Sequence, residues 1–288
     1  MKKLIISLMV FIVSISVCQA RDLEQIRQEG VLRHIGVKYA NFVSGMETGL
    51  SVDVIKLFAK HLGVKYEFVQ SSWPDVISDL VGQDIRFDGK AVIRGQKMSS
   101  RGDLIANGLT ILPWRQQVLD FSEPTFITQI WLIAPASSAL LPITPVSEPQ
   151  DIIATSSLLV GQRLMGKKDT CLDPRLYPLN QSAFTTVYFD GNLNDIAPAV
   201  VEGAADLALL DVPDALLALS RWPGEVKILG PLSEKQYMGV GFSKDSVELR
   251  QEFDRFFRQL KQDGIYAGLV RNYYPSVFQY YQDFFEFK

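Results

Sequence analysis

Apolar and polar residues repeat with two different periods along the first part of the chain. In residues 51–62 the apolar positions recur every three or four residues and Gly63 follows them, which predicts a helix that ends there. Residues 64–70 alternate between apolar and polar side chains, as in a strand. A strand before Tyr39 and a short helix before Gly82 complete an order of strand, helix, strand and helix. This order is typical of a parallel sheet covered by helices.

A second unit of the same kind follows a change in composition. A strand through Trp131 runs into a segment rich in proline and serine, which predicts a boundary. After it, residues 161–174 have the pattern of a strand, a turn and a helix start, and residues 193–219 have that of a helix, a strand and a helix. Further strands are predicted at 185–191, 225–230 and 237–245.

Three segments stand apart from this alternation. Residues 83–101 are polar, alternating and punctuated by glycine, which predicts a hairpin inserted at the edge of the first sheet. Residues 249–260 carry an apolar stripe on one helical face, and the aromatic segment 272–285 follows. We expect both of these last segments to pack onto a core.

The order of the elements predicts an α/β protein of two lobes. A first α/β unit, a boundary, a second unit and a final strand with helices fit a chain that crosses twice between the lobes. We predict one lobe from residues 21–132 together with 238–288, and an inserted lobe from residues 133–237. A cleft between such lobes is a favoured place for a ligand.

The first twenty residues have the character of an export signal. Two lysines precede an uncharged apolar run, and Cys18-Gln19-Ala20 closes it. This pattern predicts a secretory signal peptide over residues 1–20 that is cleaved after Ala20. An uncleaved membrane anchor is the alternative. Acylation of Cys18 is disfavoured because Val17 stands where a small residue is needed.

Charge and residue counts narrow the expected chemistry. The formal net charge is −3, and removal of the two lysines of the signal segment makes it −5, which argues against a nucleic acid or an anionic membrane as partner. Loss of Cys18 leaves Cys171 as the only thiol, so no intramolecular disulfide is expected. The two histidines, His34 and His61, lie far apart in sequence. We therefore expect no metal site, no cofactor and no nucleophilic triad.

Four stretches of the sequence resemble one known family. They are LRHIGVKYANF, GLSVDVIKLFAKHLGVKYEFV, GDLIANGLTILPWRQQVLDFSEPTF and VEGAADLALLDVPDAL. On these stretches the chain resembles the periplasmic solute-binding proteins of ABC importers that bind polar amino acids, extracellular solute-binding family 3. The most specific part is the spacing from Asp103 through Arg115 to Ser-Glu-Pro. The resemblance implies a two-lobed periplasmic binding protein fold of type II, with a ligand cleft and two hinge crossings.

The same resemblance implies a set of ligand-binding residues. By matching position, Arg115 grips the α-carboxylate of the ligand and Asp211 receives its ammonium group. The other positions form an aromatic wall, a polar strand end and the start of a helix in the second lobe. They are Tyr39, Phe42, Asn107, Gly108, Thr110, Thr170 and Cys171.

The chemistry of a zwitterion fits this arrangement. A guanidinium group binds a carboxylate through two parallel hydrogen bonds, which an ammonium group does not match. Backbone N–H groups of residues 170–172, at the expected helix start, add capacity to bind an anion. With Arg115 on one lobe and Asp211 on the other, closure of the lobes depends on the ligand.

Each assignment has a structural alternative. Arg115 can be a surface residue paired with Asp120 or Glu123, and Asp211 can be a helix N-cap. Tyr39 can belong to the core, and Cys171 can be a small buried hydrophobe.

The sequence also departs from the family pattern. Leu112-Pro113-Trp114 stands where a threonine and an acidic residue are usual, and Cys171 where a hydroxyl or small residue is usual. The insertion at 83–101 is longer than usual, and these differences leave the identity of the ligand open.

The leading functional hypothesis is a monomeric periplasmic protein, not an enzyme, that delivers an amino acid or related carboxylate to the permease of an ABC importer. One alternative is a dehydratase-like enzyme on the same scaffold, with an acid such as Asp173 in the cleft. A lytic transglycosylase is disfavoured because no further domain is expected before Lys288. The other alternative is an accessory or sensor protein of a periplasmic dehydrogenase system.

Overall fold

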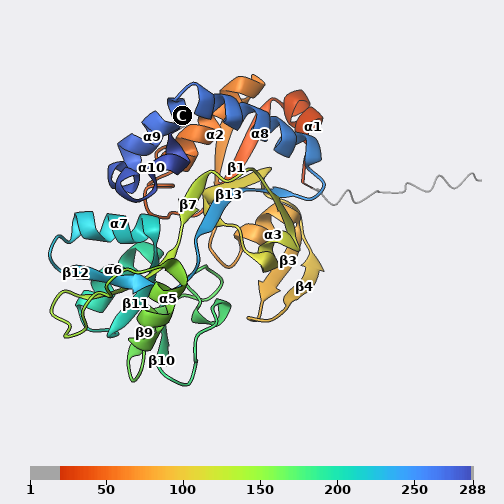
Figure 1. The fold of residues 1–288 in the computed structure, drawn as a ribbon. Helices are drawn as coiled ribbons and strands as arrows, with labels where there is room; N and C mark the ends of the chain where they lie inside the picture. The colour runs from red at the N-terminus through yellow and green to blue at the C-terminus, as the bar shows by residue number, and fades with distance from the viewer. Residues whose placement is uncertain (1–19, 287–288) are drawn as a thin grey trace, which may run out of the picture.

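The protein, analysed as a computed structural model that describes residues 20–286, has two lobes (Figure 1). The first lobe contains a six-stranded sheet in the order β2-β1-β5-β13-β6, with β7 also paired to β13. The pairs β1–β2 and β1–β5 are parallel, whereas β13 runs antiparallel to its three neighbours. These strands are β1 (Val31–Gly36), β2 (Lys65–Gln70), β5 (Leu104–Thr110), β6 (Leu119–Phe121), β7 (Phe126–Thr128) and β13 (Gln236–Ser243).

The second lobe contains a five-stranded sheet in the order β10-β9-β11-β8-β12. Strands β9, β10 and β11 are parallel, and β8 pairs antiparallel with both β11 and β12. The strands are β8 (Ile130–Pro135), β9 (Arg163–Gly166), β10 (Thr185–Tyr188), β11 (Leu207–Asp211) and β12 (Val226–Pro231). The predicted two-lobed α/β class is therefore confirmed.

Two connections join the sheets, one from β7 to β8 and one from β12 to β13. The chain enters the second sheet at Ile130, at the start of β8, and leaves it after Pro231. The assignment of residues 133–237 to the inserted lobe stays a prediction.

The helices begin and end where the sequence provides caps. Asp22 and Gln25 form a capping box at α1 (Leu23–Glu29), and Gly63 ends α2 (Leu50–Leu62) in the left-handed conformation. The predicted apolar stripe of α8 (Val247–Gln262) is buried along its length. The remaining helices are α3 (Val76–Val81), α4 (Pro113–Gln116), α5 (Glu148–Ser157), α6 (Ile196–Val201), α7 (Val212–Arg221), α9 (Ile265–Tyr273) and α10 (Phe278–Phe285).

The C-terminal aromatic segment packs at the junction of the lobes. α10 contacts β7, and the ring of Tyr237 stacks on that of Phe284 with centroids 6.0 Å apart. Trp131, at the start of the second sheet, meets the ring of Tyr280 at 5.5 Å. The prediction that this segment packs onto a core is confirmed for Phe285, which is buried.

Two local predictions need correction, and one helix was not predicted. The hairpin at 83–101 forms, as β3 (Gln83–Phe87) and β4 (Val92–Lys97), but it is a separate two-stranded sheet and does not extend the edge of the first. Helix α5, the element that was not predicted, lies at the end of the proline- and serine-rich segment. Residues 170–172 lie in a turn, and the next helical element is a single 3-10 turn at Pro174–Leu176.

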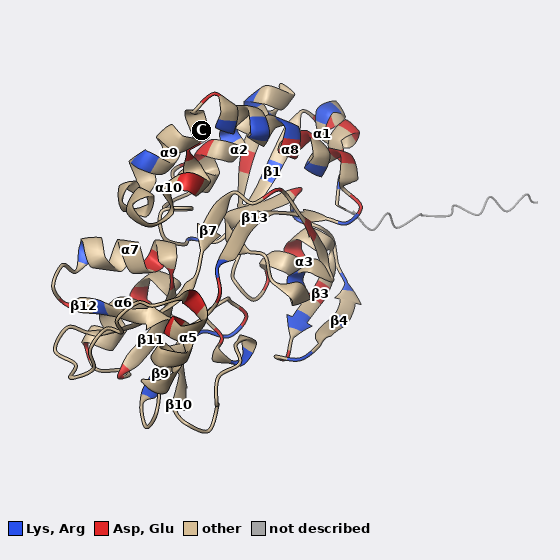
Figure 2. Ribbon diagram, viewed as in Figure 1, with Lys and Arg blue, Asp and Glu red and all other residues tan. Residues whose placement is uncertain are grey.

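The described residues contain no helix of the length and hydropathy needed to cross a bilayer. Almost all of the predicted signal peptide lies outside the described residues. Figure 2 shows basic and acidic residues interspersed along α1, α8 and the neighbouring helices.

A close approach of two backbone segments fixes the loop that leads to α2. Gly49 has a φ of 132°, and a Cβ atom there would lie 2.3 Å from the carbonyl oxygen of Phe42. We predict that Gly49→Ala lowers the free energy of unfolding by about 3 kcal/mol or more, because conformation and space both exclude the methyl group. The control Gly63→Ala, at a φ of 74° with open space around the added Cβ, costs about 1 kcal/mol. Urea denaturation measures both, and equal losses would contradict the prediction.

Candidate functional site

Arg115 lies between the lobes, at the end of the central strand of the first sheet. Strand β5 ends at Thr110, and Pro113 at the first helical turn begins the short helix α4 that carries the arginine. The side chain is 1 % exposed. Its Nη1 donates to the carbonyl oxygen of Thr110 at 2.9 Å, and Nη2 donates to that of Asp169 in the second lobe at 3.4 Å. Pairing with Asp120 or Glu123 on the surface is therefore wrong.

The guanidinium group of Arg115 has no carboxylate partner among residues 20–286. Its Nε is buried without a hydrogen-bond partner in the described structure. Burial lowers the pKa of Arg115 to about 10, against the opposing charges of nearby acidic groups, so the side chain remains a cation at neutral pH.

Asp211 is buried in the second lobe, and both it and Arg115 lie near Cys171. It ends β11 and caps α7, with its side chain accepting a hydrogen bond from the N–H of Asp214 at 3.3 Å. The Tyr39 hydroxyl donates to Oδ2 of Asp211 across the two lobes, and the Cys171 thiol donates to the same oxygen at 3.6 Å. Burial raises the pKa of Asp211 to about 6. The helix-cap interpretation of Asp211 is thus confirmed.

The side chains of Cys171 and Tyr39 are both buried. Burial raises the pKa of the Cys171 thiol, and the Asp211 carboxylate raises it further, so the thiol stays protonated at neutral pH. Its backbone carbonyl accepts a hydrogen bond from the Tyr177 hydroxyl at 2.5 Å. Burial, followed by the charges of Asp211 and Asp214, raises the pKa of the Tyr39 hydroxyl, which therefore acts as a donor.

The polar residues of β5 lie against the aromatic wall. The ring of Phe42 stacks on that of Tyr39 with centroids 5.9 Å apart. Gly108 has a φ of 70°, and a Cβ there would come within 2.4 Å of the Phe42 ring, which explains the glycine. Asn107 is fully buried, and neither of its amide atoms has a hydrogen-bond partner in the described part of the chain. A buried amide of this kind is available to a polar ligand.

The hydroxyl group of Thr170 forms hydrogen bonds within its own turn and with none of the other candidate residues. Its Oγ1 donates to the carbonyl of Lys167 at 2.9 Å and accepts from the N–H of Leu172 at 3.0 Å. These bonds hold a turn and supply no helix N-terminus, so the anion-binding helix start expected at 170–172 is wrong. The structure instead brings Tyr39, Phe42, Gly108, Thr110, Arg115, Cys171 and Asp211 to one interlobe region.

Asp214 belongs to the same region, and sequence reasoning missed it. The side chain lies in the first turn of α7, is 5 % exposed, and has an Oδ2 without a hydrogen-bond partner among the described residues. Burial and the charge of Asp211 raise its pKa. The available signal was an acid three positions after Asp211, but acidic residues are common in the first turn of any helix.

The hairpin at 83–101 explains the unusual residues before Arg115. Phe87, at the end of β3, stacks on Trp114 with ring centroids 4.8 Å apart and an angle of 6° between the planes. At the tip of the hairpin, the carbonyl oxygen of Asp88 accepts a hydrogen bond from Nη1 of Arg175 in the second lobe at 2.8 Å. The insertion therefore packs on α4 and contacts the second lobe.

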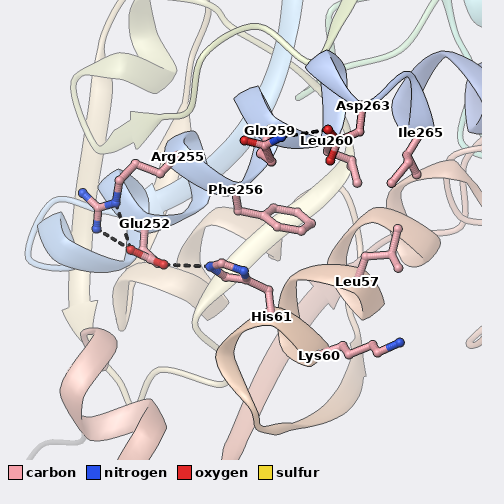
Figure 3. A pocket seen from close by; sticks show the side chains of 10 residues that line it. All are labelled: Leu57, Lys60, His61, Glu252, Arg255, Phe256, Gln259, Leu260, Asp263 and Ile265. Atoms are coloured by element: carbon pink, nitrogen blue, oxygen red, sulfur yellow. Dashed lines mark hydrogen bonds and ion pairs between the residues drawn. The ribbon is translucent and has the colours of Figure 1, made fainter.

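Other features of the molecule lie outside this site. His34 is fully buried between Tyr66 and the carbonyl of Ala106, and burial lowers its pKa to about 4. His61 lines an open hollow of about 630 Å³ between α2 and α8, where it pairs with Glu252 at 2.8 Å (Figure 3). No cluster of His, Cys, Asp and Glu suited to a metal ion occurs in the part of the chain that the structure describes.

Several known proteins are similar to this chain in sequence. The chain is 26% identical over 263 residues to the membrane-bound lytic murein transglycosylase F of Desulfosudis oleivorans, an alignment that covers 89% of this chain and 51% of the relative. It is 26% identical to the mouse glutamate receptor ionotropic, delta-1, over 77% of this chain and 24% of the receptor. The chain thus spans about half of the first relative and a quarter of the second. The lysine/arginine/ornithine-binding periplasmic protein of Escherichia coli is 25% identical over 82% of this chain and 84% of its own length.

Solved structures share the fold. A mutant of the arginine-binding protein ArgBP from T. maritima superimposes with a TM-score of 0.69 at 22% identity, covering 88% of this chain and 99% of its own. An ancestral amino acid-binding protein, a precursor of cyclohexadienyl dehydratase, gives a TM-score of 0.65 at 22% identity, over 88% and 98% of the two chains. The family model of the bacterial extracellular solute-binding proteins, family 3, matches residues 34–276. The chain belongs to this family.

Proposed function

We propose that this protein binds an amino acid or a related small carboxylate between its lobes and delivers it to the permease of an ABC importer. The observation that carries the proposal is the buried Arg115, a cation without a carboxylate partner in the described structure. Buried charges are normally paired, because the desolvation of an unpaired ion is costly. A ligand carboxylate would supply the missing partner through two parallel hydrogen bonds.

The facing lobe supports the choice of an amino acid. Asp211 has a pKa of about 6 and is ionised at neutral pH, so its carboxylate suits an ammonium group. We propose Tyr39, Phe42, Asn107, Gly108, Thr110 and Cys171 as the other ligand-binding residues, while Thr170 contributes by shaping the adjacent turn.

Family membership supports the transport role. Relatives of similar length, such as the lysine/arginine/ornithine-binding periplasmic protein, are amino acid-binding proteins by name. We propose that residues 1–20 direct export to the periplasm, that cleavage follows Ala20, and that the mature protein acts as a monomer.

The dehydratase-like alternative depends on Asp173 as its candidate acid. Asp173 forms an ion pair with Arg175 of its own lobe at 2.6 Å, so its carboxylate already has a cationic partner. A non-catalytic role fits the site better.

Substitution of Arg115 tests the proposal directly. We predict that Arg115→Lys keeps the positive charge but weakens amino acid binding by about 100-fold or more, because an ammonium group loses the planar bidentate geometry. Isothermal titration of the exported protein against the common amino acids measures the effect. The control Arg163→Lys, at an exposed pair with Asp206, leaves the affinity unchanged. Equal affinities of Arg115→Lys and the parent would refute the role of Arg115, and no binding by the parent would refute the amino acid proposal.

The buried Asp211 gives the ligand-free protein a characteristic pH dependence. Its pKa is about 6 in the folded state and about 4 when unfolded, so its contribution to stability is complete below pH 4 and is lost as the pH rises to 6. We predict that stability falls by on the order of 2–3 kcal/mol over this range, and that Asp211→Asn reduces the fall while retaining the helix cap. Urea denaturation at intervals between pH 4 and 7 measures it, and identical profiles for the two proteins would contradict the assignment.

A further inference from the structure

Two of the proposed ligand-binding residues, Tyr39 and Phe42, lie on one tight turn that follows β1. The N–H groups of Phe42 and Val43 both donate to the carbonyl oxygen of Tyr39, at 3.1 and 3.2 Å. Ala40, inside the turn, has a φ of 44°, in the left-handed region that is unfavourable for a residue with a side chain. A residue in such a conformation persists only where its surroundings hold it. The turn therefore depends on contacts from outside.

Contacts of this kind come from the other end of the chain. Tyr273 is the last residue of α9, and Tyr274 follows it. The backbone N–H of Asn41 donates to the hydroxyl oxygen of Tyr274 at 2.8 Å, and its Nδ2 donates to the carbonyl oxygen of Tyr273 at 2.9 Å. Asn41 directly follows Ala40, so both hydrogen bonds act on the strained part of the turn.

The hydroxyl group of Tyr273 holds the other end of the same loop. It accepts a hydrogen bond from the N–H of Gly49 at 3.3 Å and donates to Oδ2 of Asp53, in the first turn of α2, at 2.6 Å. The N–H of Leu50 donates to the carbonyl oxygen of Asn41 at 2.8 Å, which joins the two ends of the loop. Two adjacent tyrosines therefore fix the loop at both of its ends.

The ring of Tyr274 packs on the aromatic wall of the site. Its centroid lies 5.2 Å from that of Phe42 and 5.2 Å from that of Phe126, at the start of β7. The 3-10 turn that follows, Pro275–Val277, contacts α7 of the second lobe. The ring and the hydroxyl group of Tyr274 thus have separable roles, since the ring fills space beside Phe42 and the hydroxyl group meets the backbone of the turn.

We propose that Tyr273 and Tyr274 are positioning residues of the interlobe site, which hold the loop after β1 so that Tyr39 and Phe42 face the ligand. The inference rests on the proposed function, and it names residues outside the site that prepare it for binding. Without the two hydroxyl groups the turn relaxes toward conformations in which Ala40 is less strained. Only a fraction of the molecules then presents the aromatic wall, and the apparent affinity falls by that fraction.

Tyrosine-to-phenylalanine substitutions test this role, because they keep the rings and remove only the hydroxyl groups. In the ligand-free protein we expect the amide of Asn41 in Tyr274→Phe, and that of Gly49 in Tyr273→Phe, to exchange hydrogen at least about 10-fold faster than in the parent, as measured by NMR. Isothermal titration with the common amino acids measures the affinity, which we expect to fall at least about 10-fold in the double variant. The control Tyr280→Phe makes the same change on α10, at a half-exposed ring, and leaves both measurements unchanged.

The outcomes separate a positioning role from a purely structural one. If hydrogen exchange at Asn41 and Gly49 is unchanged, the hydroxyl groups do not hold the loop and the inference is refuted. If exchange rises but the double variant binds as tightly as the parent, the tyrosines support only the fold, and the inference is refuted while amino acid binding stands. If the folded parent binds no common amino acid, the proposed function fails and the positioning role fails with it.

A variant on the loop side covers the case in which circular dichroism shows that the double variant does not fold. Asn41→Ala removes the hydrogen bond to the carbonyl oxygen of Tyr273 and leaves both tyrosines in place. We expect it to weaken amino acid binding by about 5-fold, and an affinity equal to that of the parent would refute the inference.

Discussion

The burial of the Arg115 guanidinium group is the constraint on which the interlobe site depends. A permanent cation between two sheets is tolerated only if acceptors meet it from both sides. The carbonyl of Thr110 does so from its own lobe, and that of Asp169 from the other. Carbonyl oxygens carry no net charge, so these hydrogen bonds orient the guanidinium group of Arg115 and leave its positive charge uncompensated. This uncompensated positive charge is the basis of the proposed role of Arg115 as an anion-binding residue.

Most of the fold could be predicted from the sequence, because its signals are local. Periodic apolar residues placed α2 and α8 within a residue or two, Gly63 marked the end of α2, and alternation placed most of the strands. The errors fall where local signals conflict. Helix α5 buries only Thr155, so it lacks the apolar stripe that identifies a helix in a sequence. The hairpin of β3 and β4 has a clear pattern, but whether it joins the sheet depends on tertiary packing.

Candidate site residues could be predicted from the sequence where their local sequence environment is distinctive. They could not be predicted where only the three-dimensional contacts of a side chain identify them. Arg115 stands out beside Pro113, and Asp211 ends an apolar strand, so both could be nominated from the sequence. The turn that Thr170 holds resembles a helix start in sequence, and only the hydrogen bonds of its hydroxyl distinguish the two. Asp214 was missed because an acidic residue in the first turn of a helix is ordinary, and the burial of its Oδ2 atom without a hydrogen-bond partner in the described structure is visible only in three dimensions.

The bond between Arg175 and the hairpin tip at Asp88 has a kinetic consequence. It joins the two lobes at a distance from the buried charges, and it exists only while the lobes are together. A contact of this kind stabilises the closed arrangement without being required for the first encounter with a solute, so it acts on the rate of escape more than on the rate of entry. Under the proposed function, the insertion would therefore act on residence time through a contact that is separate from Arg115.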